Sequence, residues 1–203
     1  MAYSDYTLQK IEKDFGVKNR RKRLFTEIKY DIIPTKELLE SIEETEELLI
    51  RSEKAKSEWI VVPILRFLRK KNNKFFTIYS GDNLNADSEC GLNGECDFIL
   101  AKDTGSFEVN VPIIQLVEAK RNDTEIGIPQ CAAQMIGARV FNQQRGQEIP
   151  IIYGCVTTGD DWVFLKLEGD TIFIDSQKYY LSHITDILGV FQTIIDYYKS
   201  ILV

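Results

Sequence analysis

The stretch IIQLVEAKRNDTEIGIPQCAAQMIGARV, residues 113–140, decides the expected fold. It opens with an apolar run that ends in two charged residues, Glu118 and Lys120, and it continues through a polar segment into an amphipathic stretch. A nearly continuous apolar run is typical of a strand covered on both faces, whereas an amphipathic stretch predicts a helix. We therefore expect a buried strand over 111–120 and a helix over 127–144.

The sequence on either side of this stretch predicts the remaining elements. We expect helices at 6–15 (ending at Gly16), 35–48, 50–70 and 184–202, strands at 75–80, 96–101 and 150–158, and a hairpin around 168–170. Pro63 is expected to kink or divide the helix at 50–70. The stretch LFTEIKYDII (24–33) leaves a strand and an irregular arm both open.

Length and element order together predict a single α/β domain over residues 1–203. It would comprise an N-terminal helical extension (1–48), a core (50–158) with a mixed central sheet flanked by helices, and a C-terminal hairpin plus helix (159–203). The sequence contains no apolar run of about 18 residues and no pattern of a secretory signal, so we expect a cytoplasmic protein.

Cysteine and histidine usage disfavours a zinc site. Cys90 and Cys96 do not have the spacing of zinc ligands, and the one histidine, His183, lies far along the chain. Cys131 and Cys155 fall in amphipathic or apolar segments, so we expect both to be buried as small hydrophobic residues.

The formal net charge is −6, but two runs are strongly basic. KNRRKR (18–23) includes Arg21, and RFLRKKNNK (66–74) includes Lys70. A solvated surface is the ordinary interpretation of such runs. The alternative is that Arg21 and Lys70 contact the phosphates of a nucleic acid, in which case binding weakens steeply with salt.

Glu118 and Lys120 become candidate site residues because an acidic residue, Asp97, lies earlier in the chain, in the strand predicted over 96–101. The triplet Glu27-Ile28-Lys29 has the same spacing, but no predicted strand with an acidic residue precedes it. The spacing by itself is therefore weak evidence for a site. In a hairpin, Asp97 and Glu118 would lie side by side, and two adjacent carboxylates repel unless a cation stabilises them. Carboxylate oxygens suit Mg²⁺ or Mn²⁺, and Lys120 would point to the same side as Glu118.

This arrangement resembles the PD-(D/E)XK nuclease superfamily, which has a restriction endonuclease-like αβββαβ core. The matching residues are Asp97 in GECDFIL and Glu118 with Lys120 in LVEAK, and the resemblance covers about residues 50–158. Cys96 stands where the name-giving motif has proline. The resemblance implies that Asp97, Glu118 and the carbonyl of Ala119 bind Mg²⁺, that Mn²⁺ can substitute, and that Lys120 orients or activates water.

The helices on either side add further candidates through the same resemblance. RSEKAKSEWIVVPILRFL looks like the first core helix of the nuclease domains of type I restriction subunits and their small stand-alone relatives, in which an acidic residue faces the metal. Glu53 is the first candidate and Glu58 the alternative. Gln130 would assist at the catalytic lysine, and Gln134 would contact the substrate backbone, since residues four apart share a helix face.

We therefore expect a metal-dependent nuclease that acts on DNA, with RNA left open. The alternative is a catalytically silent restriction endonuclease-like module that binds nucleic acid or a partner protein. A restriction-modification or repair partner and a homodimer are further expectations, and the sequence predicts no membrane association. A third interpretation, in which the motif is coincidental, requires Asp97 and Glu118 to lie too far apart to share one ion.

Overall fold

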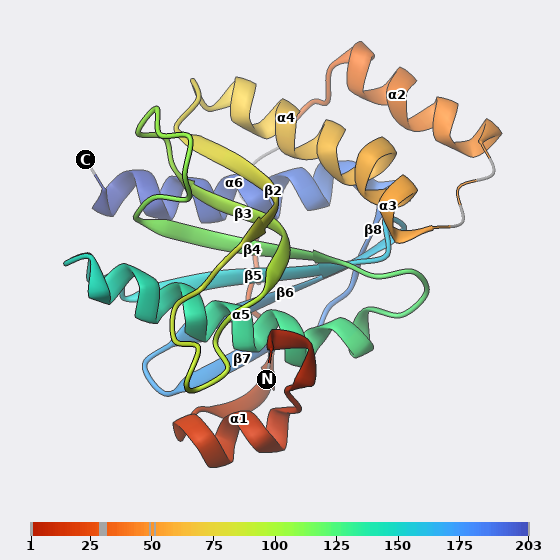
Figure 1. Ribbon diagram of the computed structural model, residues 1–203. Coiled ribbons are helices and arrows are strands. Elements are labelled where there is room, and N and C mark those ends of the chain that lie inside the picture. The colour runs from red at the N-terminus through yellow and green to blue at the C-terminus, as the bar shows by residue number, and fades with distance from the viewer. Residues whose placement is uncertain (1, 29–31, 49, 51, 203) are drawn as a thin grey trace.

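One mixed β-sheet runs through the part of the chain that the computed structural model describes, residues 2–28, 32–48, 50 and 52–202 (Figure 1). Its strands are β1 (Lys18–Lys22), β2 (Phe76–Asn83), β3 (Glu95–Lys102), β4 (Ile113–Ala119), β5 (Ile151–Thr157), β6 (Asp161–Glu168), β7 (Thr171–Asp175) and β8 (Tyr179–Tyr180). The order across the sheet is β1-β7-β6-β5-β4-β3-β2, and β8 pairs with β6.

The strand directions bring the carboxyl ends of several strands to the same end of the sheet. β2, β3 and β4 are successively antiparallel, whereas β4 and β5 are parallel and are joined by the crossover helix α5 (Thr124–Gln144). β6 is antiparallel to both β5 and β7, and β1 is parallel to β7. The carboxyl ends of β1, β7, β5 and β4 therefore lie along the same edge of the sheet.

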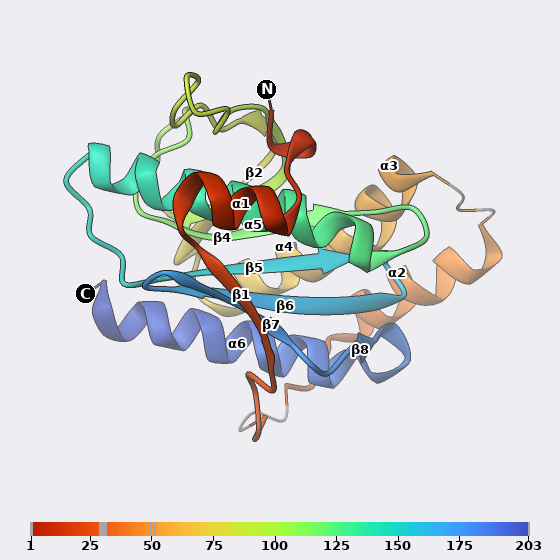
Figure 2. The same cartoon turned by 90° about the horizontal axis from the view of Figure 1, so that it is seen from below.

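Helices cover both faces of the sheet (Figure 2). α5 lies against β4 and β5 on one face, and α6 (Ile184–Ile201) lies on the other face together with α4 (Val62–Lys71). α2 (Lys36–Glu47) packs outside α4 and starts after Thr35, whose side chain accepts the N–H of Leu38. β4 is buried along its whole length, as its apolar sequence predicts.

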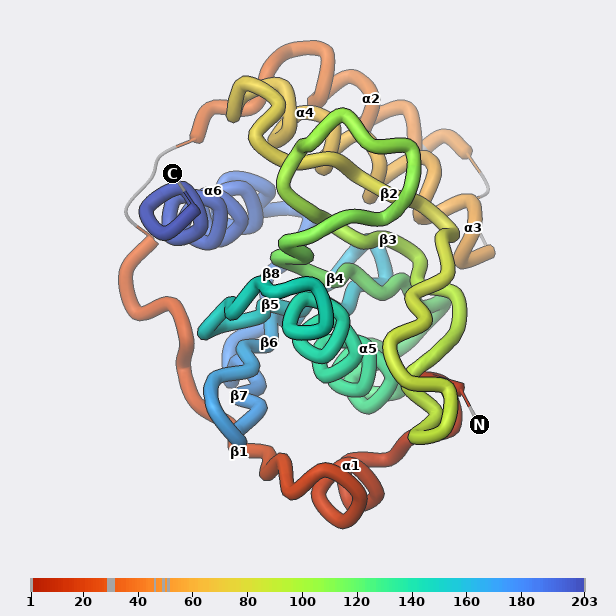
Figure 3. Tube along the Cα trace, turned by 60° about the vertical axis from the view of Figure 1, so that its left-hand side comes forward, coloured from red at the N-terminus to blue at the C-terminus, as the bar shows by residue number. Residues whose placement is uncertain are grey.

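The N-terminal segment packs over the outer side of α5, at a distance from α2 and α4 (Figure 3). It comprises a short turn (Tyr3–Asp5) and α1 (Leu8–Phe15), which ends at Gly16 in the left-handed region with φ of 69°. Tyr3 is 1% exposed and donates a hydrogen bond to the carbonyl of Leu84 at 2.9 Å. As a result α5 is covered on two sides and is buried over most of its circumference.

The helical segment before β2 is interrupted by one wide turn. α3 (Glu53–Lys56) passes into a π-helical turn (Ser57–Val61) and then into α4. The N–H of Val62 bonds to the carbonyl of Ser57, five residues back. Pro63 has no N–H to donate, so the carbonyl one turn before it has no ordinary helical partner, and the helix widens just upstream.

The architecture agrees with the expected α/β class: a mixed sheet flanked by helices. The hairpin around 168–170 is confirmed, with Gly169 at φ of 53°, and so is the burial of Cys131 and Cys155. Of the stretch 24–33, the described residues form no strand and 29–31 lie outside the description. Among the described residues, no helix is both long and apolar enough to cross a membrane.

Three expectations need correction. α5 starts at Thr124 instead of 127, because the side chain of Asp123 accepts the N–H of Glu125 and caps the helix earlier. The basic run 18–23 contributes an edge strand, which its sequence does not signal because every residue of β1 is exposed. The N-terminal extension, expected to be helical, therefore also contains a strand of the central sheet, and the expected C-terminal hairpin adds β6 and β7 to that sheet.

Candidate active site

The carboxylates of Asp97 and Glu118 meet where β3 and β4 lie side by side. The register pairs Phe98 with Val117, and its continuation sets Asp97 opposite Glu118. Oδ2 of Asp97 accepts the backbone N–H of Ala119 at 2.7 Å, which ties the acid of β3 to the end of β4. Opposite residues in an antiparallel pair have Cβ atoms about 5 Å apart. The two acids are therefore neighbours on adjacent strands.

Glu118 is a buried carboxylate whose oxygens both have partners. The residue is 1% exposed. Its Oε1 accepts a hydrogen bond from Nζ of Lys120 at 2.6 Å, and its Oε2 accepts one from Nε2 of Gln134 at 2.7 Å. Oε1 of Gln134 is buried and has no hydrogen-bond partner among the described residues. The side-chain amide of Gln134, on α5, therefore has Glu118 as its one hydrogen-bond partner among the described residues.

Lys120 is positioned between the end of β4 and the first turns of α5. Besides Glu118, its Nζ donates to Oε1 of Gln130 at 3.2 Å. Its aliphatic stem crosses Gly127, where an added Cβ would lie 2.9 Å from Cγ of Lys120. A glycine at this point lets the helix approach the lysine closely. The ammonium group is consequently aimed back at Glu118.

The charges in this cluster perturb one another. Burial first, and the charge of Asp97 second, raise the pKa of Glu118 from 4.5 to about 7. Burial likewise raises the pKa of Asp97, against the opposing effect of the Ala119 N–H and of Lys120. Burial by itself would lower the pKa of Lys120, but the charges of Glu118 and Asp97 outweigh it and raise that pKa. At neutral pH the amine is therefore a cation.

Glu53 reaches the same cluster from the start of α3. Its Oε1 accepts the backbone N–H of Arg121 at 3.0 Å, and its charge contributes to the raised pKa values of both Asp97 and Lys120. Glu58 instead lies on the exposed side of the helix, 3.9 Å from Nζ of Lys54. Of the two candidates, the structure brings Glu53 to the site.

The two basic residues singled out in the sequence lie away from this cluster. Arg21 is on β1, four strand spacings or roughly 19 Å from β4 across the sheet, although the carboxyl ends of both strands share one edge. Lys70 lies near the end of α4, roughly 25 Å along the helical segment from Glu53. The structure brings neither residue into contact with Glu118 or Lys120.

The donor set fits a hard divalent cation in its chemistry. Asp97 and Glu118 offer carboxylate oxygens on adjacent strands, and Ala119 lies between Glu118 and Lys120 with its N–H bonded to Asp97. Burial is the main cause of the raised pKa of Glu118, and the charge of Asp97 adds to it, a repulsion that a cation would relieve. Within the described ranges, no group of three or more His, Cys, Asp or Glu side chains is arranged to hold a metal ion. Mg²⁺ commonly keeps several water ligands, so two carboxylates suffice for it.

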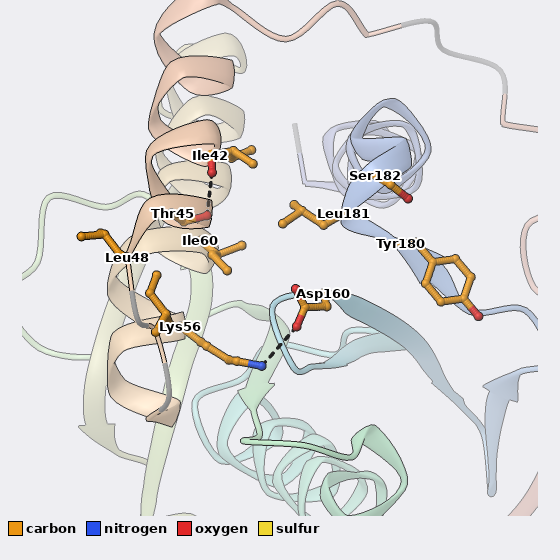
Figure 4. A pocket seen from close by; sticks show the side chains of 10 residues that line it. Ile42, Thr45, Leu48, Lys56, Ile60, Asp160, Tyr180, Leu181 and Ser182 are labelled. Carbon is orange, nitrogen blue, oxygen red and sulfur yellow. Dashed lines mark hydrogen bonds and ion pairs between the residues drawn. The ribbon is translucent and has the colours of Figure 1, made fainter.

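Two hollows border α3. The first, about 490 Å³, opens between α2 and the segment 180–182, and Figure 4 shows its lining of apolar side chains together with Thr45, Lys56, Asp160 and Ser182. At its base, Nζ of Lys56 contacts Oδ2 of Asp160 at 3.2 Å, and the same Nζ donates to the carbonyl of Arg121 at 3.1 Å. The second hollow, about 530 Å³, is lined by Ser52, Glu53, Lys54 and Arg121.

Three residues of this region escaped the sequence analysis: Lys56, Arg121 and Gly127. Arg121 follows Lys120 directly, and a second cation beside the first was the available signal. Lys56 lies three residues after Glu53, a spacing that puts both on one helix face. The sequence predicts that the helix begins at Gly127, whereas this glycine lies on the first turn of α5, against the side chain of Lys120.

Comparisons with known proteins add no assignment. No protein-family model matches this sequence, and a search of curated proteins finds no significant relative.

Proposed function

We propose that this protein is a metal-dependent nuclease that hydrolyses phosphodiester bonds, with DNA as the expected substrate. One observation carries the proposal: Asp97 and Glu118 lie at adjacent strand positions, and Lys120 and Gln134 converge on Glu118. Two adjacent carboxylates and an ammonium group are costly to assemble in a partly buried place. In metal-assisted phosphodiester hydrolysis a bound cation polarises the phosphoryl group, and a nearby positive donor stabilises the negative charge that develops.

The ion is assigned to Asp97, Glu118 and the carbonyl of Ala119, with Mg²⁺ as the first choice and Mn²⁺ as a substitute. When bound, such an ion polarises a phosphoryl oxygen and lowers the pKa of a coordinated water. Glu53 lies next to this group and would tune its charge.

Lys120 would orient the attacking water and stabilise negative charge on the phosphoryl oxygens. Its Nζ already donates to Glu118 and to Gln130, so it is held at the point where such charge would develop. Gln130 fixes the direction of the ammonium group, and Gln134 fixes the buried carboxylate. Both glutamines act as positioning residues in this scheme.

The fold supports the proposal at a coarser level. The order α4, β2, β3, β4, α5, β5 corresponds to the αβββαβ order of a restriction endonuclease-like core, with the acid on the second strand and the Glu-Ala-Lys triplet at the end of the third. The PD-(D/E)XK superfamily is thus the class to which we propose that the chain belongs.

A catalytically silent module is the second candidate. Both oxygens of Glu118 already accept hydrogen bonds from within the chain, from Lys120 and Gln134. A cation would have to use the remaining lone pairs or displace Lys120. In that case the same fold would bind nucleic acid or a partner protein without cleaving.

The decisive experiment compares wild type with Lys120→Met on linear and circular DNA and on RNA, with Mg²⁺, Mn²⁺ or EDTA. We expect metal-dependent cleavage, reduced by roughly 100-fold or more in the variant because a positioned donor contributes that much. Lys166→Met is the matched control: Lys166 contacts Glu168 at 2.8 Å with the same two-residue strand spacing, on β6.

Metal binding is measured separately by the melting temperature with and without Mg²⁺, since a ligand that binds the folded state stabilises it. We expect a rise in wild type that Asp97→Asn diminishes. A melting temperature that Mg²⁺ raises, without cleavage of any substrate, would favour the silent module. If neither cleavage nor a metal-dependent shift is found, the nuclease proposal is wrong.

A further inference from the structure

The hollow beside the site has a cationic lining that the cluster around Glu118 does not use. It lies between the start of α3 and the turn that follows β4, and has a volume of about 530 Å³. Lys54 and Arg121 contribute two positive charges to its wall, and Glu53 contributes one negative charge. The side chain of Lys54 is 85% exposed and forms a long ion pair, 3.9 Å, with the exposed Glu58, which does not line the hollow; such exposed pairs are weak. The lining is therefore net positive and open to solvent.

Arg121 is held by its main chain and not by its side chain. Its N–H donates to Oε1 of Glu53 at 3.0 Å, and its carbonyl accepts from Nζ of Lys56 at 3.1 Å. Among the described residues, no carboxylate lies within ion-pair distance of its guanidinium group. The backbone is thus fixed on both sides, while the guanidinium remains free for a ligand. The held backbone fixes the point from which the side chain of Arg121 extends, so only the side chain itself has to be ordered on binding.

The ligand class follows from the shape and charge of these groups. A guanidinium presents planar donors that match two oxygens of a phosphate, and a neighbouring ammonium adds a point charge. Arg121 directly follows Lys120 in the chain, and the hollow is also lined by Glu53, whose carboxylate accepts the N–H of Arg121.

We propose that Arg121 and Lys54 form a phosphate subsite. It would hold the nucleic-acid backbone next to the phosphodiester bond that is hydrolysed at the Glu118–Lys120 cluster. This subsite rests on the proposed function, because its ligand is the same nucleic acid. Arg121 is the binding residue, and Glu53 and Lys56 are positioning residues that act through its main chain.

Equilibrium binding of a short fluorescein-labelled DNA duplex, measured by anisotropy in EDTA at several salt concentrations, tests the subsite. We expect Arg121→Gln to weaken binding roughly tenfold and to reduce the slope of log K against log salt by about 0.9, the value for one lost phosphate contact. Arg121→Lys should keep the slope while losing affinity, because the charge remains and the paired donors do not.

Arg145→Gln is the matched control. Arg145 is an exposed arginine just after the far end of α5, stacked 3.4 Å from the ring centroid of Phe141, and its loss should change neither the affinity nor the slope. Circular dichroism establishes that each variant is folded.

The outcomes separate this proposal from the nuclease proposal. If wild type cleaves DNA but Arg121→Gln binds like wild type, the subsite is wrong and the nuclease stands. If binding depends on Arg121 but Mg²⁺ and Mn²⁺ support no cleavage, the subsite stands and the nuclease is wrong. If wild type does not bind DNA in this assay, the subsite is overturned, whereas the nuclease proposal is still judged by cleavage.

Discussion

The protonation of Glu118 links the candidate site to the stability of the whole fold. Its pKa in the folded protein is about 7, against an ordinary value of 4.5, mainly because the carboxyl group is buried. Between these two values the folded protein holds a proton that the unfolded chain has released. The free energy of unfolding must therefore fall as the pH rises through this window.

We expect Glu118→Gln to flatten this dependence. Urea unfolding without metal should show that wild type loses on the order of 3 kcal/mol between pH 5 and pH 8, since one pKa unit corresponds to about 1.4 kcal/mol. The variant should lose much less, because its side chain does not ionise. Glu168→Gln is the control, with a glutamate that is half exposed and paired with Lys166. Equal slopes in wild type and Glu118→Gln would contradict the assignment.

At the scale of elements, α5 positions the two glutamines and is itself held by the N-terminal segment. Gly137 of α5 lies under Tyr3, and an added Cβ would lie 2.9 Å from Cε1 and Cζ of that ring. Tyr3 cannot easily move away because it is buried and bonds to the carbonyl of Leu84. The close approach of α1 and its preceding turn to α5 thus depends on one glycine.

Replacing this glycine should give opposite results in two backgrounds. In an ordinary helix Gly→Ala is favourable by about 1 kcal/mol, but we expect Gly137→Ala to destabilise wild type by about 1–3 kcal/mol through overpacking. In a Tyr3→Ala background the same substitution should stabilise. Thermal or urea unfolding of the four proteins measures both effects. A stabilising Gly137→Ala in wild type would mean that the N-terminal segment is not packed on α5 in this way.

At the scale of the molecule, the two basic runs occupy different places relative to the site. β1 is the outermost strand of the sheet, and all five of its residues are exposed. It runs in the same direction as β4, so the two strands have their carboxyl ends on the same side of the sheet. Lys70 and Lys71 lie at the end of α4 that is remote from Glu53. A nucleic acid bound along the side of the sheet where β4 ends would therefore contact β1 more readily than the far end of α4.

We expect the double variant Arg20→Gln and Arg21→Gln to lower the dependence of DNA binding on salt by up to about 1.8 in log–log slope, one increment for each phosphate contact. Lys70→Gln with Lys71→Gln removes the same charge and should leave the slope near that of wild type. The pair of variants holds net charge constant, so a difference between them reports position. Equal effects would mean that the basic runs act only through overall charge.

Local chemistry carried much of the fold prediction. Gly16 and Thr35 mark helix ends through their own backbone or side-chain preferences, and Gly169 marks the hairpin. The apolar run at 113–119 specifies a strand covered on both faces. These features act over a few residues, so they can be read without knowing what lies across the sheet.

Contacts between distant segments were decided only in the folded chain. β1 joins β7 although about 150 residues separate them, and it does so through backbone bonds that leave no hydrophobic period in its sequence. The two hydrogen bonds that hold the main chain of Arg121 likewise form only because Glu53 and Lys56 of α3 pack against the turn after β4. Sequence alone identified Asp97, Glu118 and Lys120 as candidates, because acids and an amine at strand ends are chemically unusual. Which side chains surround them depends on packing, since nothing in a local pattern specifies which distant residue will fill a given space.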